Sequence, residues 1–338
     1  MDSRWGNRLY AAIGGGLLIL PLTAMAQTPG ALAPDPTSIW TIQDENSSIS
    51  SESLTDRYYT NGLKIGWVSG TDKVPGALET MGRALWGDGQ MRISFDLTQQ
   101  IYTPADTSSG NPPPGDRPFA GVLLGNFGLW SDTPTTRSNV GFSLGILGPA
   151  ALGEQIQNGL GSLIGQGEVN GWGTQLHNEP MFEFYSERTW RLNLGNIGSL
   201  ETQALPDLTV GLGVLRVYAQ PGFVIRIGQG LDADFGVARL RPGNSGGDVF
   251  LHNHAVSWYV FAGGDGRAVA HDVTIEGNTW QSSRGVKREP LVGEAEFGVG
   301  ILAWGMRLTY TQVFQSAEIR HQKGGIHQFG SLALSVRF

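Results

Sequence analysis

The stretch that decides the fold runs from Thr55 to Trp67 and reads TDRYYTNGLKIGW. Its residues alternate in chemical character, with one parity mostly apolar and the other small or polar. The apolar parity consists of Tyr59, Leu63, Ile65 and Trp67, and Asn61 alone interrupts it. Because successive side chains of a strand point to opposite faces, the stretch predicts a β-strand with one apolar face. We expect that face to point outward into lipid, which places Thr60 on the polar, inward side.

Similar alternation recurs along the chain and predicts a β protein. The candidate strands span residues 38–46, 58–69, 91–102, 119–131, 136–147, 178–192, 205–217, 219–229, 254–264, 266–276, 290–303, 304–316 and 325–338. These are thirteen segments, whereas bacterial membrane barrels usually have an even number of strands. Only the glycine-rich stretch GGDG, residues 263–266, separates the ninth segment from the tenth. We therefore expect these two segments to form one kinked strand, which gives about 12 strands.

The polar faces of these strands indicate a membrane barrel. They are rich in glycine and hydroxyl side chains, and the chain holds 50 glycines in 338 residues. Tilted strands of about 9–11 residues suffice to cross a bilayer. A sheet exposed to lipid must close, because an open edge leaves backbone groups unpaired in hydrocarbon. We predict an all-β fold, a closed antiparallel transmembrane β-barrel. The alternation alone also allows a soluble β-sandwich or a lipocalin-like barrel.

Both ends of the chain point to the bacterial outer membrane. Apolar residues alternate through the last strand to a terminal aromatic residue, Phe338. This ending resembles the terminal signature of outer-membrane barrels, and it implies recognition by the barrel assembly machinery. At the other end, Arg4 and Arg8 precede an apolar run over 11–22 and the small-x-small sequence Ala-Met-Ala at 24–26.

This N-terminal pattern is typical of a secretory signal peptide. An N-terminal membrane anchor is the alternative, but the apolar run is shorter than the ~20 residues of a full span. We therefore predict a signal peptide over residues 1–26, a tail over 27–37 and a barrel domain over 38–338. After removal of the signal peptide, the protein is expected in the outer membrane.

Composition excludes several classes of protein. The net charge of −7 and the low charged fraction of 16% argue against a nucleic-acid partner, which favours basic surfaces. The chain contains no cysteine, so disulfides, thiolate zinc sites and cysteine nucleophiles are excluded.

One segment departs from the β pattern. Residues 150–166 (AALGEQIQNGLGSLIGQ) carry apolar residues at helical spacing and predict one short helix in a loop. The stretches 70–90, 103–118, 229–253 and 277–289 exceed the length of hairpin turns and are expected to be long loops.

Four blocks, in chain order, resemble a known family. They are Asp56–Leu63 (DRYYTNGL), Gln99–Pro104 (QQIYTP) with Asp116–Gly121 (DRPFAG), Gly148–Glu154 (GPAALGE) with Gln157–Gly159 (QNG), and Gly171–Trp172 with Gln175–Pro180 (QLHNEP). Together they resemble the outer-membrane lipid A 3′-O-deacylases of the LpxR type.

The resemblance implies a 12-stranded outer-membrane barrel that removes an ester-linked acyl chain from lipid A and needs calcium. It also implies a catalytic histidine on a helix, an Asn-Asp pair at the end of the first strand and a threonine in the Tyr-Thr block. Lipid A, within lipopolysaccharide, and the surrounding outer-membrane lipids are the implied partners. Thr60 matches the family threonine directly.

The first-strand pair matches less well. The family shows Glu-Asn-Asp where this chain has Asp44-Glu45-Asn46-Ser47. One register puts Asn46 and Ser47 on the catalytic pair and loses the acid. A shift of two puts Asp44 and Glu45 there and keeps a carboxylate. The resemblance makes Asn46 and Glu45 the candidate calcium ligands.

The family's catalytic histidine is missing. After the QNGL sequence of residues 157–160 this chain has Gly161, which cannot accept or donate a proton. Loss of a general base costs about 10²–10⁴-fold in rate. His177 is the nearest replacement in the sequence, although it also belongs to the QLHNEP block.

Further residues are candidates for binding the substrate. Arg117, beside Asp116, could bind phosphate through its guanidinium group, or it could form a salt bridge at a loop end. Gln157 could point into the same site, or it could join the helix to the barrel. Tyr59, which precedes the family threonine, is a fourth candidate.

Three functions remain from the sequence. The first is a lipid A ester hydrolase. The second is a catalytically impaired family member that binds lipid A or serves a structural role in the envelope. The third is a small outer-membrane pore, which a lumen filled with bulky polar residues would exclude.

Overall fold

The computed structural model describes residues 32–49, 57–163, 168–237, 239–240 and 249–338. The predicted signal peptide and the first part of the predicted tail lie outside these described residues. Within the described part of the chain, no helix is long and apolar enough to cross a membrane.

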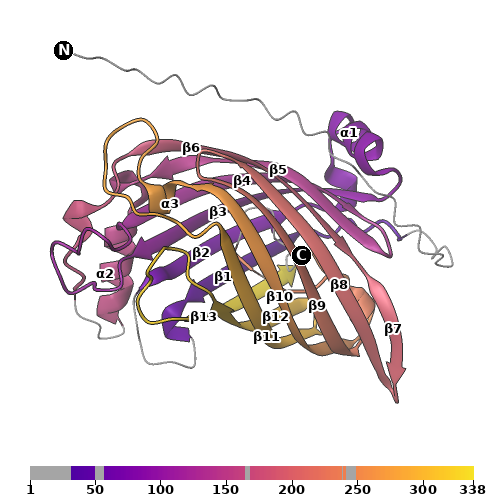
Figure 1. Cartoon of the computed structure of the whole chain (residues 1–338). Coiled ribbons are helices and arrows are strands. Elements are labelled where there is room, and N and C mark those ends of the chain that lie inside the picture. The colour runs from indigo at the N-terminus through magenta and orange to yellow at the C-terminus, as the bar shows by residue number, and fades with distance from the viewer. Residues whose placement is uncertain (1–31, 50–56, 164–167, 238, 241–248) are drawn as a thin grey trace, which may run out of the picture. The chain divides into compact units, whose positions relative to one another are not determined.

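An antiparallel sheet of thirteen strands dominates the described residues. The strands are β1 (Ile39–Asn46), β2 (Tyr58–Val68), β3 (Gln90–Thr103), β4 (Ala120–Asp132), β5 (Thr136–Leu147), β6 (Glu179–Trp190), β7 (Leu192–Ile197), β8 (Leu200–Gly213), β9 (Arg216–Gln229), β10 (Val256–Asp272), β11 (Leu291–Ala303), β12 (Met306–Gln315) and β13 (His327–Arg337). β1 pairs with β13, and β6 pairs with β8, so twelve strands form a closed ring with β7 outside it (Figure 1). This confirms the predicted closed barrel of about 12 strands.

Some of the elements in the structure were predicted from the sequence and others were not. β10 runs unbroken over 17 residues, as expected from joining segments 254–264 and 266–276. The predicted loop helix is α2 (Gly153–Leu163). Three elements were not predicted. They are β7, whose residues are all exposed and which pairs with β8; helix α1 (Gly76–Trp86), which lies in the predicted 70–90 loop; and the short helix α3 (Val273–Glu276), which follows β10 at residues predicted as strand.

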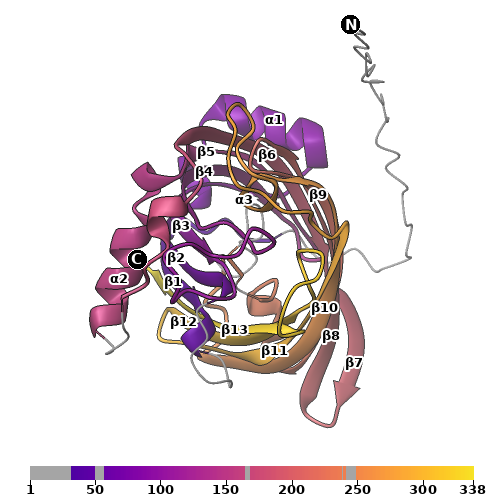
Figure 2. The same cartoon turned by 60° about the vertical axis from the view of Figure 1, so that its left-hand side comes forward.

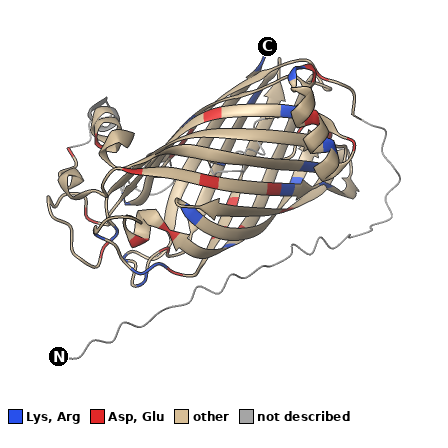
Figure 3. Cartoon of the chain, turned by 90° about the horizontal axis from the view of Figure 1, so that it is seen from above, with Lys and Arg blue, Asp and Glu red and all other residues tan. Residues whose placement is uncertain are grey.

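The two faces of the ring differ as a membrane requires. Large apolar side chains are exposed on the outer face, among them Trp40, Ile42, Ile65, Leu97, Phe184, Phe223, Ile301 and Leu334. The inward positions of the same strands carry buried polar side chains such as Thr41, Lys64, Arg226, Thr309 and Ser335. Many Lys, Arg, Asp and Glu residues lie in the connections at the two ends (Figure 3). An apolar outer face is what lipid contact demands.

The two ends of the barrel have different connections. One end bears the long connections 47–57, 104–119, 148–178, 273–290 and 316–326. The other end bears the start of β1, the end of β13, the β7–β8 hairpin and fewer long connections, 69–89 with α1 and 230–255. Outer-membrane barrels carry their longer loops outside the cell. We therefore call the first end, which holds α2, the external end.

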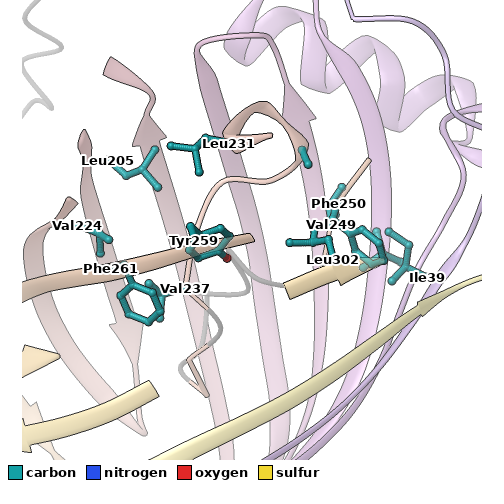
Figure 4. Packing of buried hydrophobic residues seen from close by; sticks show 12 residues of the cluster. Ile39, Leu205, Val224, Leu231, Val237, Val249, Phe250, Tyr259, Phe261 and Leu302 are labelled. Atoms are coloured by element: carbon teal, nitrogen blue, oxygen red, sulfur yellow. The ribbon is translucent and has the colours of Figure 1, made fainter. Parts of the chain in front are cut away.

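A loop from the opposite end folds back into the lumen. We call its described residues, 231–237, 239–240 and 249–250, the plug. Its apolar side chains pack against inward-facing residues of the strands (Figure 4), and the cluster consists of Ile39, Val68, Leu205, Val224, Leu231, Ala233, Val237, Val249, Phe250, Tyr259, Phe261 and Leu302. A lumen that holds this packed segment argues against an open diffusion pore.

Buried charges fasten the plug to the wall. Arg239 contacts three carboxylates: Glu45 at 3.2 Å, Glu294 at 2.9 Å and Glu296 at 2.8 Å. All four side chains are almost fully buried. The backbone N–H of Leu240 also donates to Glu45 Oε1 at 2.8 Å. Because buried charges are stable only when they are paired, the plug and the wall depend on each other.

We predict that Arg239→Met strongly destabilises the folded barrel. The substitution leaves three buried carboxylates without their shared cation, and breaking a buried pair costs about 3–5 kcal/mol. Urea unfolding in detergent micelles, followed by heat-modifiable mobility on gels, measures the change. Arg83→Met is the matched control, because Arg83 also contacts two carboxylates but on the exposed surface. Equal unfolding midpoints for the two variants would contradict the prediction.

Candidate active site

An irregularity in β2 sets the orientation of the candidate site. In the ladder with β3, Tyr59 faces Tyr102 and Asn61 faces Ile101, so Thr60 is an extra residue between two pairs. Such a β-bulge changes which face the flanking residues occupy. The predicted inward orientation of Thr60 is therefore wrong: its hydroxyl bonds the Thr103 hydroxyl at 2.8 Å. Thr103 has the parity of the lipid-exposed residues of β3.

The bulge instead turns Tyr59 into the lumen. Its hydroxyl donates to Glu45 Oε2 at 3.0 Å, and its ring packs against Tyr102 and Phe329. Glu45 is at the same time the carboxylate that binds Arg239 of the plug. Two predicted site residues, Tyr59 and Glu45, thus belong to the lumen and its plug rather than to the outer wall.

A polar cluster occupies the outer wall at the external ends of β1 and β2. We call Asp44, Asn46, Thr60, Asn61 and Thr103 the outer cluster. Asn61 Nδ2 donates to Asp44 Oδ1 at 2.9 Å, and Asn46 lies directly opposite Asn61 in the ladder. Asp44 and Asn46 share the parity of the lipid-exposed Trp40 and Ile42, so they face outward.

The structure divides the first-strand candidates between two faces. Asp44 and Asn46 lie outward, whereas Glu45 lies inward. Ser47 begins the short helical turn η1 (Ser47–Ile49) and is buried. Asn46 Oδ1 accepts hydrogen bonds from the backbone N–H of Ser48 at 2.7 Å and from its hydroxyl at 2.6 Å. The register that aligns Asn46 and Ser47 with the family's pair therefore contributes Asn46 to the outer cluster. The register that aligns Asp44 and Glu45 with that pair contributes Asp44.

Helix α2 packs against the outside of the same barrel wall, at β3 and β4 (Figure 2). Its first residue, Gly153, approaches Gly121 of β4 so closely that a Cβ on Gly153 would lie 3.1 Å from the Gly121 Cα. Ile156 packs against the cluster of Ile101, Phe119 and Trp172. Along β3, Gln99 and Ile101 contact the α2 segment and Thr103 bonds Thr60, so β3 connects the helix to the outer cluster.

Gln157 holds α2 in place. Its Oε1 accepts a hydrogen bond from Trp172 Nε1 at 3.0 Å, and the side chain is buried. The bond joins α2 to the short helical turn η4 (Trp172–Thr174) in the same connection and not to a barrel strand, so it is not the helix-to-barrel bond that the sequence offered as the alternative to substrate binding. Gly161, where the resemblance implies a histidine, lies in α2 four residues, about one helical turn, after Gln157.

Arg117 and Asp116 serve the interior rather than a phosphate. The Arg117 guanidinium is fully buried; it bonds Glu318 Oε2 at 2.6 Å and Thr274 Oγ1 at 2.8 Å, and it stacks on the ring of Tyr102. Asp116 accepts from the backbone N–H of Arg117. Burial alone would raise the pKa of the Glu318 carboxyl, but Arg117 and Arg267 offset this and hold it below its usual range. The loop-end salt bridge is what the structure contains.

His177 does not join the outer cluster. It is exposed, and its backbone N–H donates to Asn278 Oδ1 at 3.0 Å. No hydrogen bond in the described structure links its ring to the outer cluster. The one carboxylate among the five residues of that cluster is Asp44.

The outer cluster offers oxygen donors to a cation. Among the described residues, no group of three or more His, Asp or Glu side chains could hold a metal ion. Calcium, however, also takes amide and hydroxyl oxygens. Asp44 supplies one carboxylate and Asn46 one amide oxygen, and the buried Asn61 Oδ1 has no hydrogen-bond partner in the described structure. The donors fit calcium in kind, with a single negative charge; Glu45, bound to Arg239, is not among them.

Sequence reasoning missed Asn61 and Thr103 as members of the site. The sequence did contain a signal, because Asn61 is a polar residue at a position whose neighbours in the alternation are apolar and lipid-facing, near the end of the strand. Gln99 breaks the outward parity of Phe95 and Leu97 in the same way.

We predict that Gly153→Ala loosens α2 from the wall. The new Cβ would lie 2.7 Å from the Trp172 ring, which cannot move without breaking its bond to Gln157. Gly159→Ala is the matched control in the same helix, because a Cβ there meets no atom within 4 Å. Limited proteolysis of the 148–178 connection should be faster for Gly153→Ala and unchanged for Gly159→Ala. Equal cleavage rates would show that the Gly121–Gly153 contact does not hold the helix.

Comparison with solved structures gives a strong likeness to another outer-membrane protein. LpxR from Salmonella typhimurium superposes with a TM-score of 0.74 at 19% sequence identity, covering 89% of this chain and 100% of that chain. The β domain of the Bordetella autotransporter BrkA (TM-score 0.40, 13% identity, 90% of this chain and 99% of that chain) and the translocator domain of NalP from Neisseria meningitidis (0.41, 9%, 91% and 90%) are much less similar.

Comparison with sequences defines the family. No curated protein matches the chain. The family model described as "Outer membrane protein LpxR" matches residues 14–338, nearly the whole chain. The protein therefore belongs to the LpxR family of outer-membrane proteins.

Proposed function

We propose that the protein is a lipid A 3′-O-deacylase, which hydrolyses an ester-linked acyl chain of lipid A. One observation carries the proposal: the outer cluster faces the lipid side of the wall, not the lumen. A lipid substrate stays in its leaflet with its chains in the membrane, so an enzyme for it needs its reactive groups on the outer surface. Family membership supports the same activity.

The position along the wall also suits this substrate. The outer cluster lies at the external ends of β1 and β2, beside the long external connections. Lipid A occupies the external leaflet, and its ester bonds lie near the boundary between the sugar and the acyl chains. α2 covers the neighbouring wall and forms one side of the site.

Each residue of the outer cluster has its own role in the proposed hydrolysis. The Asp44 carboxylate takes a proton from water, and the resulting hydroxide attacks the ester carbonyl. The Thr60 hydroxyl and the amide of Asn46 or Asn61 donate hydrogen bonds to the oxygen that becomes negative. Collapse of the tetrahedral intermediate releases the fatty acid, and Asp44 returns the proton to the departing alkoxide. Calcium held by Asp44, Asn46 and Asn61 would supply positive charge near that carbonyl oxygen.

Gly161 supports a second candidate function. The family's proton acceptor at this position is replaced by a residue with no side chain. A protein with an intact outer cluster and docked α2 but no efficient base would bind lipid A and turn it over slowly or not at all. In this alternative the protein is an impaired member that binds lipopolysaccharide. For either function, assembly into the membrane would use Phe338 as the signal for the barrel assembly machinery.

Mass spectrometry of lipid A separates the two functions. We expect the refolded wild-type protein to release one acyl chain with calcium and none with a chelator. Gly161→His should raise the rate by about 10²–10⁴-fold, because it restores a general base one turn from Gln157. If only Gly161→His is active, the natural protein is the impaired relative. If neither is active, the deacylase proposal is wrong.

A second experiment tests the role of Asp44 as the proton acceptor. We expect Asp44→Asn to lower the rate by about 10²–10⁴-fold while the barrel stays folded, because the amide cannot accept a proton. The comparison is made in the wild-type background, because a histidine at position 161 would replace Asp44 as the proton acceptor. Asp88→Asn, at an exposed position near the other end, is the matched control. An unchanged rate in Asp44→Asn would remove Asp44 from the mechanism.

A further inference from the structure

Helix α1 lies against the outside of the barrel, at the end opposite α2 (Figures 1 and 2). Its contact residue is Gly82, where a Cβ would lie 2.7 Å from the Met91 sulfur and 3.5 Å from Leu129. Met91 and Leu129 share the parity of the lipid-exposed Phe95 and Phe127 on β3 and β4. The helix is therefore packed on the lipid-facing wall and not on the lumen.

The sequence of α1 divides its surface into a wall face, a charged face and an apolar face. Gly82 lies at the centre of the wall face, with the partly buried Leu78 and Trp86 one turn to either side. Glu79 and Arg83 pair at 2.8 Å on the charged face, and Arg83 also pairs with Asp88 at 2.7 Å just beyond the helix. Met81 and Leu85 lie roughly 160° around the helix from that charged pair.

The apolar face of α1 contacts no other part of the described chain closely enough to be buried. Met81 is 41% exposed and Leu85 is 55% exposed. These values match the lipid-facing belt below the helix, where Phe95 is 43% and Phe127 is 40% exposed. The apolar face of α1 is thus as uncovered as the lipid-facing wall on which the helix packs.

The position of α1 matches the boundary of a membrane. α2 meets β4 at Gly121 and α1 meets it at Leu129. Eight residues of a strand span about 26 Å, which is about 20 Å in height at a tilt near 40°. The apolar band of outer-membrane barrels is about 25 Å tall. The two helices therefore bracket the hydrocarbon layer, one at each surface.

We propose that α1 is an interfacial anchor that binds the phospholipids of the inner leaflet of the outer membrane. Met81 and Leu85 enter the acyl chains, while Glu79 and Arg83 remain in the periplasmic water. Amphipathic helices in this orientation bind interfaces through their apolar face. The anchor fixes the depth of the barrel and thereby holds the outer cluster at the level of the opposite headgroups. This anchoring role is independent of the proposed enzymatic activity.

Site-directed spin labelling tests the anchor. Because the chain has no cysteine, one label can be placed at a time. The variants are Met81→Cys, Leu85→Cys, Thr80→Cys and Arg83→Cys, with Phe127→Cys as the reference for lipid contact. Each is refolded into phosphatidylethanolamine–phosphatidylglycerol vesicles, and heat-modifiable mobility selects the folded protein. The measurement compares collision of the label with oxygen, which concentrates in lipid, and with a water-soluble nickel chelate.

We expect the oxygen-to-nickel ratios at 81 and 85 to shift to that of Phe127→Cys, and those at 80 and 83 to remain at the value for water. Equal nickel accessibility at all four helix positions would place the apolar face in water and overturn the proposal. Labels at 81 and 85 that neither reagent reaches would also overturn it, because a second copy or another protein would then cover the face.

Discussion

Every backbone N–H and C=O inside a membrane must find its partner within the protein, and this constraint governs the whole barrel. The ladders from β1 around to β13 satisfy it, and the register from Ile39–Arg337 to Asn46–Gly330 closes the ring. Thr60 is a local exception, placed at the external end where other polar groups are within reach. The bulge there turns Tyr59 into the lumen and leaves Thr60 and Asn61 on the outer wall. An irregular pairing has thus placed buried polar groups within an otherwise apolar wall.

The same two strands serve the plug on one face and the outer cluster on the other. Along β1, the inward Glu45 lies between the outward Asp44 and Asn46. Glu45 is held by Arg239, by the Leu240 N–H and by Tyr59. Packed ionic contacts on the inner face therefore restrain the backbone that carries the outer residues. Reactive groups held by a rigid support keep their geometry better than groups on a loop.

The fold could be predicted from the sequence because lipid imposes a strict alternation on every strand. Alternation and the even strand count together identified the ring and the joining of two segments into β10. They did not reveal β7, because all of its residues are exposed and show no alternation of buried and exposed positions. They did not reveal α1 either, because the apolar residues of this short helix did not stand out from a loop sequence.

The site was less predictable, because its geometry depends on contacts distant in the chain. Parity counting cannot detect a bulge, so Thr60 was assigned to the wrong face. Arg117 forms an ion pair with Glu318, which lies 201 residues later in the chain, and nothing in the local sequence predicts that pairing. By contrast, Asn61 was visible as a polar residue on an apolar face. Polar interruptions near strand ends are therefore the better sequence signal for a site on the outside of a barrel.

A site that opens sideways from the wall has a kinetic consequence. The proposed lipid substrate would arrive by lateral diffusion within one leaflet, so the quantity that sets occupancy would be the mole fraction of that lipid among its neighbours. The concentration of that lipid in the whole sample volume does not determine how often it encounters the site. Diluting the membrane with another lipid would slow turnover, while diluting the vesicles in water would not. Packing of the leaflet, through divalent ions that bridge its headgroups, would then regulate the reaction from outside the protein.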